Sequence, residues 1–334
     1  MAKIGQIERK KNKLVNVIPL NTPYTVMISP TDFCNLNCIF CEYHSPDAKF
    51  FKEQNNMSFS LFKMIIDQLL EFPDKVKLLT LDDYGEPTLN KELPKMIAYA
   101  KEKDVAERIM LVTNGTLLNP QLNKAIVEAG LDEIKISVEA IDERKFQKIT
   151  SFKINMDRFI SNIRDLYENK NNLYVFIKTV DIALEGKVDE QRFYSIFNPI
   201  SDSMDIEHII PHSTHPEEIQ LQTMGIPTFS DTTISGKKAK DKSICPHLMY
   251  YLAITPSGDV YPCSNGKRSR YFLGNVEKEE LTKIWKSPYL RKLRIANIIG
   301  ERKNVGKCLE CQFLRYTIDD DLEEDREEML KKFL

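Results

Sequence analysis

The residues with the clearest chemical potential are seven cysteines, which form two groups far apart in the sequence. Three lie close together in CNLNCIFC, namely Cys34, Cys38 and Cys41. Four lie in the last third of the chain, namely Cys245, Cys263, Cys308 and Cys311. A cubane iron–sulfur cluster takes one thiolate on each of its four irons. The first group would therefore leave one iron open for chemistry, whereas the second would close its cluster completely.

Composition narrows the class of protein. The 334 residues predict a large domain plus a smaller module, and the formal net charge of -2 favours neither nucleic acid nor an anionic membrane as a partner. No apolar run approaches the ~20 residues of a membrane helix, and the basic N-terminus lacks the apolar stretch of a signal peptide. An odd number of cysteines without an export signal argues against a disulfide framework. We expect a cytoplasmic protein.

Segments rich in buried-strand residues alternate with helical patterns along the first two thirds of the chain. Strands are expected in residues 25–31, 76–87, 107–115, 133–140, 173–180 and 204–211. Helices are expected after Ser58 as N-cap, over 91–103, from Asn119-Pro120 to Gly130, and around 155–169. Such alternation predicts an α/β fold with a parallel sheet, a partial (β/α)6 barrel of the TIM type. Its active site should lie at the C-terminal ends of the strands.

The remaining segments suggest a second, smaller unit. We expect a lead-in (1–22), the barrel (23–212), a linker (213–243), a small α+β unit (244–318) and an acidic helix or tail (319–334). The linker either crosses the barrel mouth or simply connects the two units. A strand, a turn at 256–259 and a return strand are expected in the small unit, where Trp285 anchors a helix. The acidic end is expected to be a solvated surface.

Several of these motifs together resemble those of the radical S-adenosylmethionine (SAM) enzymes. CNLNCIFC is CxxxCxxC with Phe40 before its third cysteine, and it follows the first expected strand. TLDDYGEPTLN resembles the GGEP motif of that family, TNGTLL its third strand end, and ISVEAID its fourth. The resemblance covers roughly residues 25–210. Tyr84 stands where the family has its first glycine, which makes the local backbone path less certain than the role of Glu86.

The resemblance implies that Cys34, Cys38 and Cys41 hold a [4Fe–4S] cluster that binds and reductively cleaves SAM to a 5′-deoxyadenosyl radical. A zinc knuckle or a set of buried thiols is the alternative. Glu86 is expected to pair with the SAM ammonium, and the open backbone at Gly85 to let the ligand approach. Further SAM contacts are expected from the following residues: Phe40, Tyr43, Thr113, Asn114 and Ser137. For Ser137, a buried strand serine is the plain alternative.

The second cysteine group is similar to the SPASM or Twitch extension of radical SAM enzymes. A full SPASM module holds two auxiliary clusters with more cysteines, so four cysteines favour one fully ligated [4Fe–4S] cluster of the Twitch type. A structural zinc held by four thiolates remains the alternative. A fully ligated cluster is suited to moving an electron. That role favours oxidation of a carbinol, whose radical is a strong reductant.

Three functions are compatible with these features. The first is SAM-dependent dehydrogenation of a sugar, cyclitol or similar small molecule. The resemblance implies that an external flavodoxin or ferredoxin reduces the enzyme. The second is modification of a peptide substrate. It is less expected because many peptide-modifying members of the family carry a peptide-recognition domain before the barrel, and only about two dozen residues precede the barrel here. The third is an electron carrier or zinc-stabilised binding module, which would have no use for Glu86 or an open cluster. Epimerisation is disfavoured because all seven cysteines are assigned to iron, leaving no thiol to quench a radical.

Four residues are candidates for substrate chemistry at the strand ends. Asp82 and Asp83 follow the second expected strand, where they bind substrate or merely cap the strand. His208 and His212 flank the end of the sixth strand and are candidates for a base, although a loop-supporting histidine is more common. Lys178 could grip an anionic substrate, but an ion-pair role is expected more often.

Overall fold

The protein is represented by a computed structural model, which describes residues 2–4, 13–41, 54–83, 85–210, 231–264, 271–304, 308, 311, 313–317 and 320–334. Within this part of the chain, one ten-stranded sheet has the order β1-β7-β6-β5-β4-β3-β2-β8-β9-β10. The strands are β1 Lys3–Ile4, β2 Thr25–Ile28, β3 Leu78–Leu81, β4 Ile109–Thr113, β5 Glu133–Ser137, β6 Tyr174–Val180, β7 Ser203–Glu207, β8 Tyr251–Ile254, β9 Asp259–Tyr261 and β10 Gly274–Asn275.

The helices follow the strands in the first two thirds of the chain and gather beside the sheet edge in the last third. The α-helices are α1 Leu14–Val17, α2 Phe59–Leu69, α3 Leu93–Glu102, α4 Pro120–Glu128, α5 Glu143–Thr150, α6 Met156–Glu168, α7 Gly186–Phe197, α9 His247–Tyr250, α11 Leu281–Trp285, α12 Pro288–Ile298, α13 Phe313–Tyr316 and α14 Arg326–Phe333. The 3₁₀ turns are η3 Pro87–Leu89, η4 Asp181–Ala183, η5 Asn198–Ile200 and η6 Glu301–Asn304.

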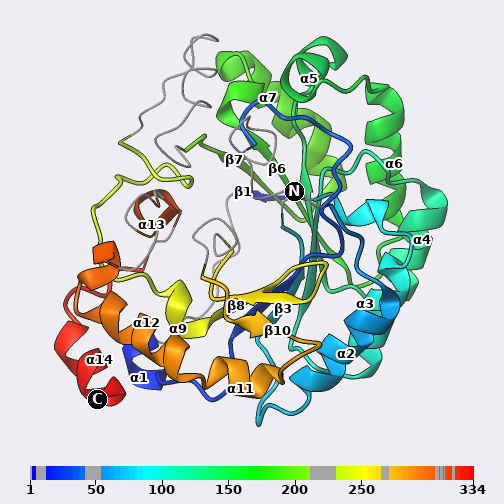
Figure 1. Ribbon diagram of the computed structural model, residues 1–334. Helices are drawn as coiled ribbons and strands as arrows, with labels where there is room; N and C mark the ends of the chain where they lie inside the picture. The colour runs from blue at the N-terminus through cyan, green and yellow to red at the C-terminus, as the bar shows by residue number, and fades with distance from the viewer. Residues whose placement is uncertain are drawn as a thin grey trace.

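Strands β2 to β7 form the expected half-barrel. Each pairs in parallel with the next, from Thr25 opposite Leu78 at one side to Val180 opposite Glu207 at the other. Helices α2 to α7 form an outer layer around the convex face of this sheet (Figure 1). The predicted partial (β/α)6 architecture is therefore confirmed.

The sheet does not stop at the six barrel strands. Strand β8 pairs in parallel with β2, with Tyr251 opposite Thr25, and β9 returns antiparallel to it. Strand β1 pairs in parallel with β7 at the other side. The hairpin predicted for the small unit thus covers the barrel's open edge, whose backbone groups would otherwise lack partners. The second cysteine group is consequently attached directly to the strand that leads into the first.

Two N-cap residues expected from the sequence stand at the starts of their helices. The Ser58 side chain accepts a hydrogen bond from Leu61 N at the start of α2, and Asn119 caps α4 in the same way. Helix α5 was not predicted, because its eight residues are mostly polar. It begins at the N-cap Asp142, whose carboxylate accepts from Lys145 N.

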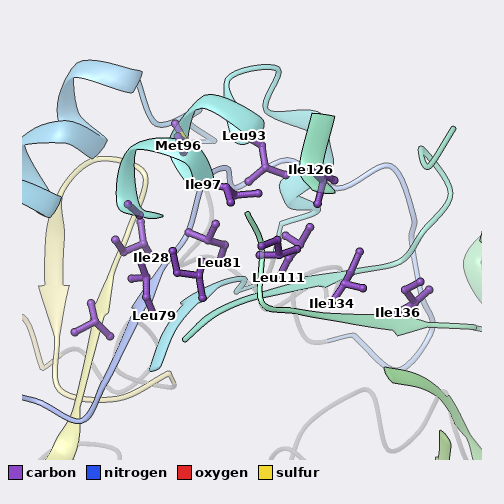
Figure 2. Packing of buried hydrophobic residues seen from close by; sticks show 14 of the residues in the cluster. Ile28, Leu79, Leu81, Leu93, Met96, Ile97, Leu111, Ile126, Ile134 and Ile136 are labelled. Carbon is purple, nitrogen blue, oxygen red and sulfur yellow. The ribbon is translucent and has the colours of Figure 1, made fainter. Parts of the chain in front are cut away.

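The main core lies between the outer face of the sheet and the helices. Figure 2 shows Ile28, Leu79, Leu81 and Leu111 from the strands packing toward the side chains of α3 and α4. The barrel's inner face is more polar, as the alternation of side chains along a strand requires when only one face packs on helices. This inner wall is available for chemistry.

A smaller, second core joins the two ends of the chain. Helix α14 lies beside the short helix α1 (Figure 1), and Lys332 Nζ donates to the Val15 carbonyl. The buried members of this core are Val15, Ile18, Ile244, Met249, Ile298, Leu322, Met329 and Phe333. The prediction of a solvated acidic end is therefore wrong for its apolar side, because Met329 and Phe333 recur at helical spacing.

Trp285 joins α11 to the lead-in segment. Its side chain is 1% exposed, and Nε1 donates to the Leu20 carbonyl at 2.9 Å. The Arg294 guanidinium lies 4.0 Å from the centre of its ring. No helix in the described part of the chain has the length and apolar character needed to cross a membrane.

Candidate active site and metal centres

The first cysteine group lies in the loop that follows β2. Two of its backbone groups are fixed by the end of α5, since Asn37 N donates to Thr150 O at 2.8 Å and Ile39 N to Ile149 O at 2.9 Å. All the cysteine side chains of the chain are free of disulfides. The loop is thus held by an adjacent helix, which leaves its thiols available as ligands.

Electrostatics indicate that these thiols lie close together. Burial raises the pKa of Cys34 to about 11. It also raises the pKa of Cys38 far above the ordinary value, with Cys41 and Cys34 among the further causes. Thiols in this state stay protonated unless a cation compensates their charge, as coordinated iron does. Three soft donors are the ligand type that an iron–sulfur cluster requires, although no group of three or more His, Cys, Asp or Glu side chains among the described residues is already arranged to hold a metal ion.

Gly85 has a packing role that differs from the one expected. A Cβ at this position would lie 2.0 Å from the Thr31 carbonyl oxygen and 3.0 Å from that of Phe33. The following residue, Glu86, donates its N–H to Phe33 O at 2.8 Å. The open space at Gly85 is thus filled by the cysteine loop rather than left for a ligand. The glycine allows the strand β3 loop to approach the cysteines.

Glu86 is a buried carboxylate at the centre of a hydrogen-bond network. Its Oε1 accepts from Thr88 N, from the Thr88 hydroxyl and from the Thr113 hydroxyl at 2.6 Å, and its Oε2 accepts from Asn114 N at 2.7 Å. Burial raises its pKa, whereas these donors oppose the rise. The network fixes a carboxylate beside the cysteine loop, where it can receive a cationic group.

The remaining predicted SAM contacts are distributed around this network. Asn114 Nδ2 donates to Asn35 Oδ1 at 3.0 Å and so connects β4 to the cysteine loop. Ser137 ends β5 in register with Lys178. Phe40 packs, partly buried, against the main core. Tyr43 and Tyr84 lie outside the described residues.

Asp82 and Asp83 follow β3 at the barrel mouth. Asp82 Oδ1 is shielded from solvent and accepts no hydrogen bond from the described residues. Burial raises the pKa of Asp82 to about 6, although Thr80, Lys135 and Lys178 lower it. Asp83 has a backbone φ of 143°, in the region that favours glycine. Such strain, roughly 1–3 kcal/mol, tends to occur at functional sites.

Charged residues extend this wall across β5, β6 and β7, and two of them, Lys135 and Glu207, were missed by the sequence analysis. Lys178 forms an ion pair with Glu207, whose pKa is lowered mainly by that lysine against the effect of burial. Lys135 has no ion pair with any described residue, and its Nζ lies 5.0 Å from the Phe176 ring centre. Burial lowers the pKa of Lys135. The sequence signal for these lysines was the alternation of polar and apolar residues, KIS in β5 and IKT in β6, which places each lysine on the face opposite to the apolar residues.

Glu139 is the second missed carboxylate. It is 8% exposed, and burial raises its pKa to about 7, while Lys178 lowers it and Glu207 raises it. It also raises the pKa of Cys34 and Cys38, which places it on the cysteine side of the cavity. The barrel interior therefore combines unpaired and paired charges within one polar wall.

The two histidines that were candidates for a catalytic base have less support from the structure. His208 Nδ1 lies 3.0 Å from Asp181 Oδ2, and its backbone N–H donates to Ile234 O. These contacts attach the end of β7 to the segment that follows residue 230, which is a supporting role. His212 and most of the predicted linker lie outside the described residues.

The second cysteine group gathers near the edge strand β8. Burial raises the pKa of Cys245 to about 12, with the Cys311 and Cys308 thiols among the further causes. Cys311 N donates to Cys308 O at 3.4 Å. Burial raises the pKa of Tyr251 well above its ordinary value, and the negative charges of Asp82, Asp83 and Cys263 add to this rise. Tyr251 begins β8, the strand that pairs with β2.

Two family models match the chain. The model described as "Radical SAM superfamily" matches residues 28–191. The model described as "Iron-sulfur cluster-binding domain" (SPASM) matches residues 245–312. The chain belongs to the radical SAM superfamily. Its C-terminal part is a SPASM iron–sulfur domain, so the radical SAM cluster with SAM and an auxiliary cluster are its cofactors.

Known relatives agree with this membership. The Fe-coproporphyrin III synthase of Methanosarcina barkeri is 30% identical over 182 residues, which are 51% of this chain and 43% of that protein. The matched region therefore spans only about two fifths of that relative's length.

Solved radical SAM structures share the fold. BtrN in complex with AdoMet and 2-DOIA is 17% identical with a TM-score of 0.57, covering 89% of this chain and 96% of that one. Streptococcus suis SuiB bound to S-adenosylmethionine is 15% identical with a TM-score of 0.60, covering 84% and 70%. At these identities the likeness shows the fold alone.

Proposed function

We propose that this radical SAM enzyme oxidises a carbinol of a polar small molecule, such as a sugar or cyclitol, and that one auxiliary cluster accepts an electron. The observation that carries the proposal is the shielded Asp82 oxygen Oδ1, which accepts no hydrogen bond among the described residues. A buried carboxylate oxygen that no described donor occupies is suited to receive a hydroxyl proton at a barrel mouth. Carbinol oxidation requires such an acceptor.

The seven free cysteines and the buried carboxylate of Glu86 are the residue types that these cofactors require. Cys34, Cys38 and Cys41 would hold the cluster that binds SAM, with Glu86 pairing with its ammonium group. The auxiliary cluster would be held by the following residues: Cys245, Cys263, Cys308 and Cys311. When bound, these groups supply a 5′-deoxyadenosyl radical and an electron acceptor.

The residues of the chain would perform the proton chemistry. Carbinol oxidation removes one hydrogen atom from carbon, one proton from oxygen and one electron. Asp82, with its pKa of about 6, is mostly ionised near neutral pH and can take the proton. The Lys135 ammonium, which has no ion pair among the described residues, can donate a hydrogen bond to substrate oxygen, while Lys178 remains paired with Glu207. A wall of this kind suits a substrate rich in hydroxyl groups.

The reductant is proposed to be a flavodoxin or ferredoxin. The second candidate function is peptide modification, because SuiB, which shares this fold at a TM-score of 0.58, has been solved bound to its precursor peptide SuiA. In that case Asp82 would act on a side chain presented to the same wall. Radical epimerisation is a third possibility for the same wall, with a tyrosine in place of the missing thiol.

A deuterium-transfer experiment distinguishes these functions. Sugars and cyclitols deuterated at carbinol carbons are incubated anaerobically with reconstituted enzyme, SAM and dithionite. We expect deuterium in 5′-deoxyadenosine and a carbonyl product that has lost one deuterium and one hydrogen atom. A product that has only exchanged its deuterium for hydrogen, and keeps the carbinol, would indicate epimerisation. Transfer from deuterated peptides alone would establish peptide modification and overturn the proposal.

The pH dependence tests the role of Asp82. A base acts only when it is deprotonated, so product formation should fall about tenfold per pH unit below the pKa of about 6. The Asp82→Asn variant should lose roughly 100- to 10,000-fold in product formation and lose this acid limb. An unchanged acid limb in the variant would assign the proton to another group.

A further inference from the structure

The backbone that delivers Cys245 is held by side chains from distant parts of the chain. Asn297, in α12, contacts both backbone groups of Cys245: its Oδ1 accepts from Cys245 N and its Nδ2 donates to Cys245 O, each at 2.9 Å. Asn297 is 1% exposed. Both peptide groups of a cysteine ligand are therefore satisfied by a single buried amide.

Glu323 fixes the two residues before Cys245. Its Oε1 accepts from Ser243 N at 2.6 Å and from Ile244 N at 3.0 Å, and its Oε2 accepts from the Ser243 hydroxyl at 2.8 Å. Arg326 donates to Glu323 Oε2 at 2.5 Å and to Ser243 Oγ at 2.6 Å. One carboxylate thus binds three donors within two consecutive residues.

Apolar packing reinforces these polar contacts. Ile244 is fully buried in the second core together with Met329 and Phe333 of α14. Arg326 also donates to the Ile298 carbonyl at the end of α12. The residues Glu323, Arg326, Met329 and Phe333 are called the terminal clasp below.

We propose that the terminal clasp is a positioning element of the auxiliary metal site, which together with Asn297 holds Cys245 where it can bind iron. The proposal rests on the second cluster of the proposed function but not on the identity of the substrate. In this proposal, the negative charge of Glu323 in the acidic end of the chain fixes the backbone of Ser243 and Ile244, which leads into Cys245.

The position of Cys245 explains why such a clasp is needed. The other ligands come from a β-hairpin and from the closely spaced pair Cys308 and Cys311, whereas Cys245 precedes a helix of only four residues, α9. A helix that short cannot stabilise its own start. The ring of His247, in α9, stacks on Tyr251 at 5.0 Å, so the start of β8 packs against this same short helix.

The test compares two substitutions of glutamate near the C-terminus. Glu323→Ala removes the clasp carboxylate, whereas Glu327→Gln changes an exposed residue in the first turn of α14 and serves as control. After anaerobic reconstitution, wild type and control should hold about eight irons per chain and Glu323→Ala about four. In electron paramagnetic resonance, the remaining reduced cluster should respond to added SAM. Release of 5′-deoxyadenosine without substrate should stay within about twofold of wild type.

Three other results would overturn or replace this assignment. A Glu323→Ala variant that holds about eight irons with unchanged spectra would refute the clasp. If this variant fails to fold, Asn297→Ala, which removes only the Cys245 contacts at that position, should give the four-iron state, and eight irons there would refute the proposal. A wild-type chain holding only the SAM-responsive cluster would refute the auxiliary cluster itself, a distinct failure that removes the proposed electron acceptor as well.

Discussion

The two cysteine groups are built in opposite ways. The first occupies eight consecutive residues in one loop, and its supports come from the strand ends and helix that follow in the barrel. The second is spread from Cys245 to Cys311, and its supports include a buried amide in α12 and a carboxylate near the C-terminus. A site made by one loop tolerates loss of distant contacts. A site assembled from several segments depends on each segment being held.

This difference also separates their proposed roles. The first site needs an open position beside a buried carboxylate, and Glu86 provides that carboxylate through contacts to β4 and η3. The second site needs closure, which requires all four ligands to converge. Strand β8 pairs in parallel with β2, the strand that leads into the first cysteine group, and Cys245 precedes β8 in the chain. The edge strand β8 therefore links the segments that carry the two cysteine groups.

The largest predicted effect comes from removing one ligand of each group. Cys38→Ala should lose the first cluster and release no 5′-deoxyadenosine above background, because SAM has no iron to bind. Cys245→Ala should keep this release but form no oxidised product. Iron analysis and chromatography of the nucleoside measure both variants. Equal loss of 5′-deoxyadenosine in the two variants would mean that the sites do not act independently.

A methyl group at Gly85 should disturb the first site alone. In Gly85→Ala the Cβ would meet the Thr31 carbonyl, a backbone atom that cannot rotate away, so the cysteine loop must shift. We expect loss of most iron from the first cluster, while the SAM-insensitive signal of the second remains. Gly236→Ala is the control for backbone strain away from the first site, because φ is 75° at this glycine and its Cβ would meet only the His208 side chain. Retention of the SAM-responsive signal in Gly85→Ala would show that the loop can move freely.

The sequence predicted the first site because its ligands, its strand and its glutamate are local motifs. Cys34, Cys38, Cys41 and Glu86 all follow β2 or β3 directly, where a parallel barrel places its chemistry. Pattern alone did not reveal the packing role of Gly85, since the atoms that an added Cβ would meet come from residues 31–33. Sequence spacing does not report which backbone passes behind a glycine.

The supports of the second site could not be predicted in the same way. Asn297 lies in an ordinary helix and Glu323 in an acidic run that is typical of solvated surface. Their partners are about fifty and eighty positions away along the chain. The missed residues Lys135 and Glu207 are similar, because a charge inside a barrel is recognised only when the opposite strand is known.

Glu86→Gln should weaken SAM binding while leaving both clusters in place. The variant removes a buried negative charge but keeps the shape of the side chain. The affinity for SAM should fall about 10- to 100-fold, or about 1.4–2.8 kcal/mol. Titration of SAM against the spectrum of the first cluster measures this change. The control is Glu139→Gln, the other buried carboxylate near the cysteines, and an equal effect there would mean that general negative charge, rather than Glu86, binds the ammonium.

The smallest effect is expected at Trp285, which joins α11 to the lead-in segment. Trp285→Phe removes the hydrogen bond to the buried Leu20 carbonyl and part of the ring that lies against Arg294. The Arg294 Nε donates to the Leu248 carbonyl in α9, so this contact reaches the backbone near Cys245. We expect a loss of about 1–3 kcal/mol of unfolding free energy, measured anaerobically in urea, with the second cluster released before the first. Tyr289→Phe, at an exposed residue of α12, should change stability by less than about 0.5 kcal/mol. Simultaneous release of both clusters from Trp285→Phe would show that the two sites share one cooperative unit, despite their different construction.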